Sequence, residues 1–491
     1  MRASGDRLDP NRLLPWLSVA AAGGWFGTIA LRFPAADGDL LWQRWLGERI
    51  LRDHAIPRAL GAETFAASGA PWTPHEWLFS LLLAFSSDRG APWAVPLLCS
   101  VALAGALIMV VLRCARRGVP PVRAASAVLF CSLAMLQSFG VRAQVLGWAG
   151  LTTVVWLLES DGPLAWAAIP ATIVWANLHA SALLAPVLAA TFTLTAFARD
   201  RRWTPAVRRS AAIAAGCAAA TVATPLGLDL PRYAVALSLS PIRQSISEWG
   251  PAGMGSAAFV LGALPLVLLL LAFGARASVR DRILACAFAL LLFSAVRNVP
   301  VFALVAAPVA LAALPRRGAA APAAVAPGAR AAAWALAAVL ALMGPALALL
   351  VWRAAPARTA LLPFEPARTL LRVAASPPRV FCEDFAWCSI FLSETRAARF
   401  FMDGRCDPYP VPVWREYREV LDGTRRWAAV LDARHIDAIL VRRNGTLDSL
   451  LAERPHTWRA IASDERARVY VRPALVRAAA RRPALAALSA R

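Results

Sequence analysis

The sequence predicts a polytopic α-helical membrane protein with a small α/β domain at its C-terminal end. Hydrophobic residues make up 59% of the 491 positions, and the mean hydropathy is +0.54. Soluble globular domains have a markedly smaller apolar share. Apolar runs of bilayer length recur as far as about residue 352, which is the pattern of membrane-spanning helices. After about residue 355 the runs become short and mixed, which favours a separate folded domain.

The apolar runs predict about eleven membrane spans, each near the roughly 20 residues that cross a bilayer. Their ranges are 13–33, 92–112, 122–139, 142–158, 163–179, 181–198, 207–223, 254–274, 282–296, 299–314 and 331–352. The first run has no small-residue cleavage site before the loop that follows it, so we expect it to remain as a span. Residues 1–354 would then form a transmembrane domain, with residues 34–90 as its first outer loop.

The formal net charge of +22 comes from arginine, because the sequence contains no lysine. The arginines cluster in alternate loops, in five groups: Arg2, Arg7 and Arg12; Arg113, Arg116, Arg117 and Arg123; Arg199, Arg201, Arg202, Arg208 and Arg209; Arg276, Arg280 and Arg282; Arg316, Arg317 and Arg330. Loops rich in basic residues stay in the cytoplasm, so we expect a cytoplasmic N-terminus. Topology and contacts with lipid headgroups account for this charge, and we expect no nucleic-acid partner.

The opposite, outer side receives nearly every unusual polar residue of the chain. These residues are Asp37, Asp39, His75, Glu76, Arg142, Gln144, Asn177, His179, Glu248 and Arg297. Polar groups at membrane depth usually face a cavity or one another. We therefore expect one site at the outer surface, with the two aspartates, His179 and Arg297 around a common cavity. Taken singly, each residue also fits a solvated loop position or a helix cap.

The first outer loop contains two stretches with helical patterns. In LLWQRWLGERILRD (40–53), apolar side chains cover about half of the helical circumference, as in a helix that lies in the membrane interface. In PWTPHEWLFSLLLAF (71–85), Thr73 and Glu76 have the spacing of a capping box. We expect a second helix with Thr73 as its N-cap, too short to span the bilayer.

Asp37 and Asp39 place two carboxylates close together after the first span. Such a pair suits a divalent cation, Mg²⁺ or Mn²⁺, that bridges to phosphate oxygens. One carboxylate is equally suited to take a proton from an attacking hydroxyl. Without partners, the pair also fits a turn in which the aspartate side chains bond main-chain amides.

Several short motifs occur in a particular order along residues 13–315. They are Asp-x-Asp at 37–39, His-Glu-Trp-Leu at 75–78, Arg-x-Gln at 142–144, Trp-Ala-Asn-Leu-His at 175–179, Pro-Leu-Gly at 225–227 and Glu-Trp at 248–249. This order resembles a family of bacterial multi-spanning proteins similar to the GT-C glycosyltransferases, with looser similarity around residues 401–405. The resemblance implies transfer of a sugar from a polyprenyl-phosphate donor to a glycan, lipid or protein acceptor of the cell envelope. It places this reaction at the outer face of the bacterial inner membrane.

The resemblance also assigns roles to individual residues. Asp37 or Asp39 becomes the base, or the acid that binds a metal or the donor phosphate. The candidates for holding the donor phosphate or substrate are His75, Glu76, Arg142, Gln144, Asn177, His179, Glu248 and Arg297. The sequence departs from the family pattern at Gln43, where a histidine usually follows the tryptophan. That change implies metal independence, an altered substrate or loss of activity.

Two other classes of function remain open on the sequence. One is a transporter or flippase of lipid-linked saccharides, which would carry ionisable residues midway through its spans and internal repeats. The other is a non-catalytic membrane scaffold that carries the outer domain. Neither ionisable residues at mid-span nor repeats are evident in the sequence, so the transferase is the favoured interpretation.

Residues 355–472 form the expected outer α/β domain, which would be periplasmic. Strand patterns occur in RVFCEDFAWCSIFL, ARFFMDGRC, DAILVRR and ARVYVRP, and helical patterns in WREYREVLDG, RRWAAVLDARHI and LDSLLAER. Cys382 and Cys388 are candidates for a local disulfide in an oxidising compartment. The stretch 402–405 fits either a tight turn or part of an acceptor surface. Residues 318–330 read as a cytoplasmic linker and 473–491 as an Arg/Ala-rich tail.

Overall fold

The computed structural model describes residues 10–32, 38–160, 162–315, 362–374, 376–394 and 399–475, with the single positions 335, 342, 346, 349 and 353. Most of the predicted span 331–352, the linker 318–330, Asp37 and the tail from residue 476 lie outside the described residues. The chain divides into two compact units. The helical unit comprises Met1–Pro34, Ala91–Val235 and Ile246–Ala355, and the mixed unit comprises Ala35–Gly90, Ala236–Ser245 and Pro356–Arg491.

The helical unit consists of long, apolar helices. They are α1 (Pro10–Arg32), α4 (Ala94–Arg116), α5 (Pro121–Met135), α6 (Ala143–Leu158), α7 (Ala168–Leu178), α8 (Leu184–Asp200), α9 (Pro205–Ala220), α11 (Leu264–Phe273), α12 (Val279–Ser294) and α13 (Val299–Ala313). A further helix, α10 (Asp229–Leu239), runs from the helical unit into the mixed unit. Each of the first ten predicted spans overlaps one of these ten helices, which are those of the described part of the unit.

Five helical stretches of the described residues are long and apolar enough to cross a membrane. They are Asn11–Arg32, Ala94–Arg116, Ala180–Asp200, Phe259–Arg276 and Val296–Ala313. Helices α5 and α6 are apolar but shorter. A polytopic helical membrane protein is therefore confirmed, whereas the predicted number of eleven spans is not.

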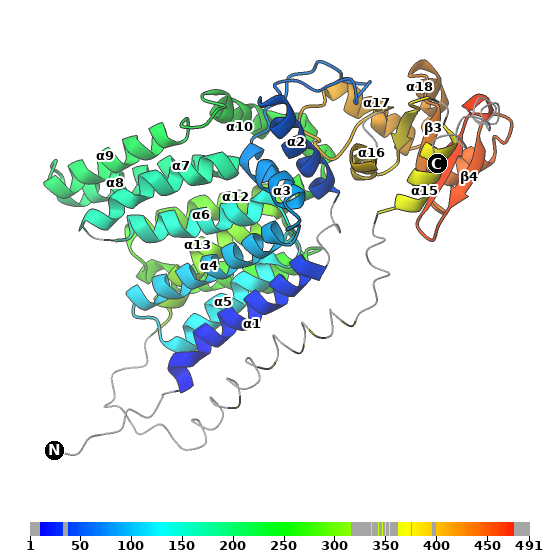
Figure 1. The fold of residues 1–491 in the computed structure, drawn as a ribbon. Coiled ribbons are helices and arrows are strands. Elements are labelled where there is room, and N and C mark those ends of the chain that lie inside the picture. Colours follow the sequence, from blue (N-terminus) through cyan, green and yellow to red (C-terminus); the bar gives the residue numbers. More distant parts are fainter. Residues whose placement is uncertain are drawn as a thin grey trace, which may run out of the picture. The chain divides into compact units, whose positions relative to one another are not determined.

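Helix α13 is the central helix of the helical unit and packs against α4, α5, α6, α11 and α12 (Figure 1). Every residue of α13 except Ala312 is buried. Pro308 lies inside the helix and has no N–H to donate to the carbonyl of Leu304. Arg113, near the end of α4, donates from Nη1 to that carbonyl at 2.8 Å and from Nη2 to the Val305 carbonyl at 3.3 Å. An arginine thus replaces the hydrogen bond that the proline removes.

The same arginine belongs to a buried ion-pair network. Arg113 is fully buried and pairs with Glu159, the residue after α6, at 2.9 Å. Arg117 pairs with Glu159 at 2.7 Å and with Asp281 of α12 at 3.1 Å. The network joins α4, α6, α12 and α13 through segments that the sequence assigns to one side of the membrane.

The mixed unit contains a five-stranded sheet with the strand order β2–β1–β3–β5–β4. The strands are β1 (Arg379–Cys382), β2 (Arg399–Phe400), β3 (Ala438–Arg442), β4 (Arg459–Ser463) and β5 (Ala467–Val471). Strand β1 is parallel to β2 and β3, while β5 is antiparallel to β3 and β4. The helices of this part are α15 (Phe364–Val373), α16 (Ser389–Glu394), α17 (Val411–Leu421), α18 (Trp427–Ala433) and α19 (Thr446–Ala452).

Most of these elements coincide with the predicted patterns, and three do not. Helix α16 lies at the end of RVFCEDFAWCSIFL, where a strand pattern is predicted. Strand β4 is largely exposed and consists mainly of alanine and serine, so it lacks the apolar alternation that identifies strands. Helix α15 contains Pro366 in its first turn, which obscured its pattern. The predicted disulfide between Cys382 and Cys388 is confirmed and links β1 to the 3₁₀ turn η10 (Phe385–Cys388).

The first outer loop belongs to the same compact unit as this sheet, although composition grouped it with the transmembrane domain. Thr64 forms a parallel bridge with Phe400 of β2. The Phe400 N–H donates to the Glu63 carbonyl at 2.8 Å, and the Phe65 N–H donates to the Phe400 carbonyl at 3.3 Å. The loop therefore extends the sheet at its β2 edge, which would otherwise expose unpaired main-chain groups.

A second buried arginine fastens the outer loop to the C-terminal residues. Arg405 pairs with Asp403 at 2.9 Å and with Glu63 of the loop at 3.1 Å. Its guanidinium carbon lies 5.2 Å from the ring centre of Trp45 and 4.9 Å from that of Trp72. Planar stacking of this kind suits arginine and not lysine.

The charges of this cluster are fixed by their surroundings. Burial alone lowers the pKa of Arg405, but the facing Asp403 carboxylate outweighs burial and raises that pKa above its ordinary value. Burial raises the pKa of Tyr409 well above its ordinary value, so its hydroxyl stays a donor and bonds Asp403 at 2.9 Å. Because Asp403 and Arg405 are buried, their side chains do not form an acceptor surface.

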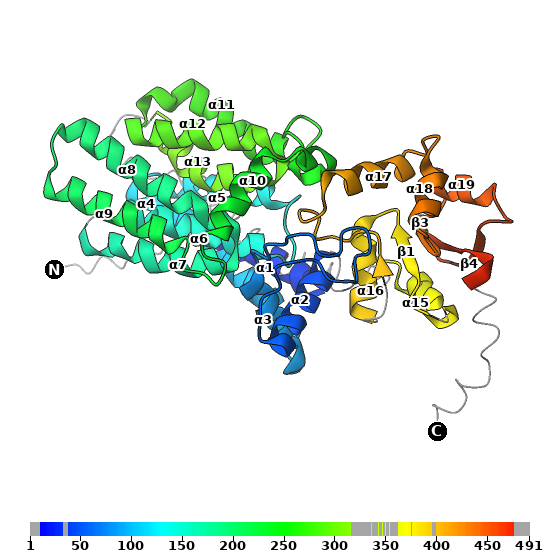
Figure 2. The same cartoon turned by 90° about the horizontal axis from the view of Figure 1, so that it is seen from above.

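Two helices of the outer loop pack closely (Figure 2). The predicted helix over 40–53 is confirmed as α2 (Asp39–Asp53). A Cβ on Gly47 would lie 1.9 Å from the Ser80 carbonyl oxygen of α3 (Trp77–Asp88), so only glycine permits this approach. The predicted N-cap at Thr73 is wrong, because α3 begins at Trp77 after a turn in which His75 N–H bonds the Thr73 carbonyl.

We expect Arg113→Met to destabilise the helical unit by about 3–5 kcal/mol, because the change leaves buried Glu159 partly uncompensated and removes the donors to α13. Thermal unfolding of the purified full chain in detergent measures this loss. The matched control is Arg202→Met, since Arg202 is exposed. Equal unfolding temperatures for the two variants would contradict a structural role of the network.

Candidate functional site

Three connecting segments of the helical unit meet through predicted site residues. Arg142, the extended residue before α6, pairs with Glu248 of η5 (Ser247–Trp249) at 2.6 Å. The guanidinium carbon of Arg297, in η8 (Val296–Asn298), lies 4.5 Å from the Trp249 ring centre. Gln144 donates from Nε2 to the Arg297 carbonyl at 3.3 Å. The structure thus brings four of the sequence-predicted residues together.

The two arginines of this group differ in electrostatic state. The charge of Arg142 is balanced by Glu248. Within the part of the chain that the structure describes, no carboxylate pairs with Arg297, whose partner is the face of Trp249. Arg297 therefore contributes a positive charge that a bound anion can neutralise.

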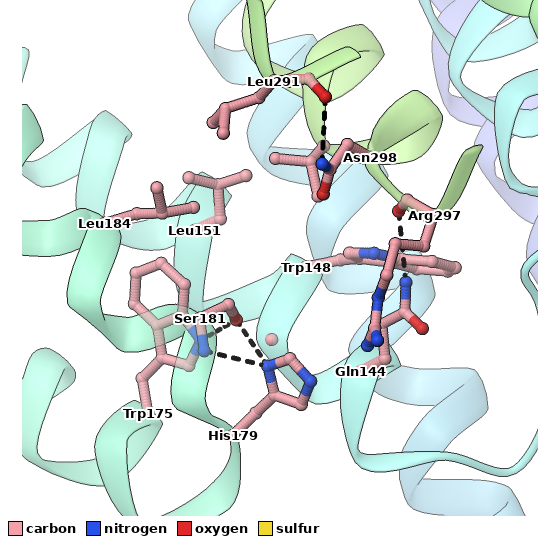
Figure 3. Close-up of a pocket in the computed structure, with 12 residues that line it drawn as sticks. Gln144, Trp148, Leu151, Trp175, His179, Ser181, Leu184, Leu291, Arg297 and Asn298 are labelled. Atoms are coloured by element: carbon pink, nitrogen blue, oxygen red, sulfur yellow. Dashed lines mark hydrogen bonds between the residues drawn. The ribbon is translucent and has the colours of Figure 1, made fainter. Parts of the chain in front are cut away.

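A cavity of about 120 Å³ lies beside this group, between α6, α7, α12 and α13. Its polar lining consists of Gln144, Trp148, His179, Ser181, Arg297 and Asn298 (Figure 3). Leucines from α6, α8 and α12 supply an apolar part of the wall. The indole nitrogen of Trp148 is buried and has no hydrogen-bond partner among the described residues. Trp148, whose N–H has no partner among the described residues, and the cationic Arg297 thus line the same cavity.

His179 lies where α7 meets the 3₁₀ turn η3 (Ala180–Leu183) and is only 7% exposed. Its Nδ1 is 2.7 Å from Ser181 Oγ and accepts the Ser181 main-chain N–H at 3.1 Å. Trp175 donates from Nε1 to Ser181 Oγ at 3.0 Å. His179 is thus held by hydrogen bonds on one side of its ring.

Asn177 is not brought to the cavity. Its side chain is half-buried and donates to the carbonyls of Ile173 and Ala223 at 2.8 and 3.0 Å. These bonds tie α7 to the turn after α9, so the contacts of Asn177 are those of a structural residue. Within the Trp-Ala-Asn-Leu-His motif, Trp175 and His179 therefore line the cavity, whereas Asn177 holds α7 against the turn after α9.

A second group of predicted residues lies in the mixed unit. Asp39 is the first residue of α2, and its Oδ1 accepts from Trp42 Nε1 at 3.0 Å. One turn later, Gln43 donates from Nε2 to the Glu76 carboxylate. His75 Nε2 is 3.6 Å from Glu76 Oε1. The Glu76 carboxylate, which the sequence assigns to the N-terminal cap of its own helix, thus accepts a hydrogen bond from Gln43 of α2.

The oxygen atoms of this group are of the type that hard divalent cations prefer. Asp39 and Glu76 offer carboxylates, and the Gln43 Oε1 atom is buried with no hydrogen-bond partner in the described part of the chain. A buried amide oxygen without a donor is costly and suits a cation ligand. Asp37, the other predicted acid, lies outside the described residues.

The sequence did not identify every residue of these groups. Trp148 and Ser181 line the cavity, yet each sits within an apolar run where it reads as a packing residue. The one available signal was the position of Ser181, two residues after His179. The expected convergence of Asp39 with His179 and Arg297 stays a prediction, because these residues belong to different compact units.

The apolar helices define a multi-pass membrane protein, and a small mixed sheet follows them along the chain. No family model and no curated protein matches the sequence. A similar solved structure is the archaeal oligosaccharyltransferase AglB from Archaeoglobus fulgidus in complex with an inhibitory peptide and a dolichol-phosphate. It has a TM-score of 0.55 at 11% identity, over 93% of this chain and 74% of that chain.

An apo form of an oligosaccharyltransferase from the same organism is also similar. Its TM-score is 0.54 at 10% identity, over 87% of this chain and 69% of that chain. These oligosaccharyltransferases are GT-C superfamily enzymes, so the predicted resemblance to the GT-C fold is confirmed. At this identity, the likeness concerns the fold alone.

We expect Gly404→Ala to displace the Asp39 carboxylate without removing it. A Cβ on Gly404 would lie 2.9 Å from Asp39 Oδ1 and 3.1 Å from Trp42 Cδ1. Hydrogen exchange should therefore become faster over the first turn of α2, residues 39–43. Gly253→Ala is the control, because its added Cβ would meet no atom within 4 Å. Unchanged exchange in both variants would show that Gly404 does not position Asp39.

Proposed function

We propose that the protein is a GT-C-type glycosyltransferase. It would move a sugar from a polyprenyl-phosphate donor to a cell-envelope acceptor at the extracytoplasmic face of the bacterial inner membrane. The fold supports this proposal, since a similar solved structure is an oligosaccharyltransferase in complex with a peptide and a dolichol-phosphate. The acceptor is a glycan, a lipid or a protein.

One observation carries the proposal: the outer cavity of the helical unit combines a cation with hydrogen-bond donors. Arg297 has no carboxylate partner among the described residues, and the Trp148 N–H is unused. Both border the same cavity of about 120 Å³. A departing lipid phosphate carries negative charge, which fixed cations and N–H donors stabilise as the glycosidic bond breaks. Arg142 pairs with Glu248, the residue before Trp249, on whose ring Arg297 lies.

The acid of the first outer loop supplies the other half of the reaction. The acceptor hydroxyl must lose its proton as the anomeric carbon gains oxocarbenium character, and Asp39 or Asp37 is the proposed base. A direct single displacement of this kind inverts the anomeric centre. The Trp42 N–H bond to Asp39 Oδ1 orients the carboxylate that is the proposed base.

A divalent cation, Mg²⁺ or Mn²⁺, is the proposed cofactor. Asp39, Glu76 and the Gln43 amide oxygen would hold it, with Asp37 as a further candidate ligand. When bound, the cation would supply charge stabilisation for phosphate oxygens. Gln43 stands where the family pattern has a histidine, and its unpartnered oxygen makes this position compatible with a metal site.

We expect Asp39→Asn to lower the transfer rate by roughly 10²–10⁴-fold, because the amide cannot accept the proton of the acceptor hydroxyl. Transfer from a polyprenyl-phosphate sugar by the purified chain in nanodiscs gives the rate. Asp53→Asn, at the exposed end of the same helix, is the control. Asp37→Asn is assayed in parallel, and full activity in both Asp37 and Asp39 variants would overturn the enzyme proposal.

We expect Arg297→Gln to weaken donor binding about 10- to 100-fold, because a hydrogen bond to a charged group contributes about 1.5–3 kcal/mol. The measurement is the KM for the polyprenyl-phosphate sugar. Arg232→Gln serves as the control, since that side chain is 74% exposed on α10. If Arg297→Gln leaves KM and kcat unchanged, this cavity does not hold the donor phosphate.

A further inference from the structure

Three side chains of the helical unit form a hydrogen-bonded chain that ends on His179. Trp175 Nε1 lies 3.0 Å from Ser181 Oγ, and Ser181 Oγ lies 2.7 Å from His179 Nδ1. The Ser181 main-chain N–H also points at Nδ1, at 3.1 Å. Figure 3 shows these contacts at the wall of the cavity. Neither Trp175 nor Ser181 was a candidate site residue on the sequence.

The directions of these hydrogen bonds fix the proton on the imidazole. An indole nitrogen and a main-chain amide can only donate. Nδ1 receives the amide hydrogen of Ser181, so in the neutral ring Nδ1 is the acceptor. Ser181 Oγ receives the indole hydrogen of Trp175, and its own hydrogen is then available to the same Nδ1. The neutral ring therefore carries its proton on Nε2.

Helix α6 enforces this arrangement through two glycines. A Cβ on Gly147 would lie 2.7 Å from Ser181 Oγ and 3.2 Å from His179 Nδ1. A Cβ on Gly150 would lie 2.5 Å from Cγ of Trp175. Trp175 and His179 are 2% and 7% exposed, so the chain of hydrogen bonds is enclosed. Any larger residue at either position would push a member of the chain aside.

We propose that Trp175 and Ser181 are positioning residues that hold His179 as an Nε2–H donor, and that this donor serves a phosphate oxygen of the lipid-linked substrate. The second half rests on the proposed function, whereas the first half stands on the hydrogen bonds alone. A ring nitrogen that carries a proton has no lone pair for a metal. The assignment therefore favours an anion over a cation at Nε2 of His179.

The tautomer can be measured without any assay of activity. The full chain contains five histidines. We would record ¹⁵N-histidine NMR spectra of the wild type and of His179→Gln in nanodiscs at neutral pH. The difference between the two spectra isolates the signals of His179. We expect the Nε2–H tautomer. Observation of the Nδ1–H tautomer would overturn the inference at once.

Two substitutions test the positioning role. Ser181→Ala removes the nearer of the two groups at Nδ1 and keeps the main-chain N–H. The share of the Nε2–H tautomer should therefore fall without vanishing, together with a fall of about tenfold in kcat/KM. Ser181→Thr keeps the hydroxyl and should restore both readings. A wild-type tautomer spectrum in Ser181→Ala would refute the role of Ser181, even if transfer slowed.

The phosphate assignment is tested separately with a short-chain polyprenyl monophosphate. Its addition should shift the Nε2 resonance of His179, and inorganic phosphate at the same concentration should shift it less. An unchanged resonance would refute phosphate binding by His179. If the Nε2–H tautomer is present but the wild-type chain transfers no sugar, the proposed function fails while the positioning role holds.

Discussion

Burial of arginine is the constraint on which both units depend. A guanidinium carries five N–H donors and a permanent charge, so it can be buried only where carbonyls and carboxylates converge on it. Arg113 gathers Glu159 and two carbonyls of α13, and Arg405 gathers Asp403 and Glu63. Each requirement draws together segments that are distant in sequence. The helix packing and the attachment of the outer loop follow from these two residues.

The candidate site lies away from the Arg113 network, at the other end of the helices that the network joins. Arg113 lies near the C-terminal end of α4, while Cys99, near its N-terminal end, approaches the Arg142 carbonyl at 3.9 Å. The network and the Arg142 group therefore occupy opposite ends of one helix. At the Arg142 end, the short turns η5 and η8 lie between the helices, and Arg297 and Asn298 of η8 line the cavity. Glycines of α6 provide the space in which Trp175, Ser181 and His179 meet.

Helices with a regular apolar pattern could be predicted from the sequence. Contacts between residues that are far apart in the chain could not. Apolar runs located α1, α4 and α13 because their length reflects the bilayer, and the pattern of 40–53 located α2. Glu63 gave no signal, because its meaning depends on a partner 342 residues away. Thr73 and Glu76 matched a capping box, yet a tertiary bond from Gln43 takes the carboxylate. Residue spacing predicts helices and strands, but the partner of a buried polar side chain depends on which segments the fold brings together.

The pairing of residues 63–65 with Phe400 also sets an order for folding during synthesis. The outer loop leaves the ribosome long before β2 and Arg405 exist, so it must wait for more than three hundred residues before its edge pairing and its ion pair can form. Closing so long a loop is slow. Until then Glu63, Trp45 and Trp72 lack the partner that orders them. A nascent chain that stops before residue 405 would therefore carry Asp39 on an unfinished loop.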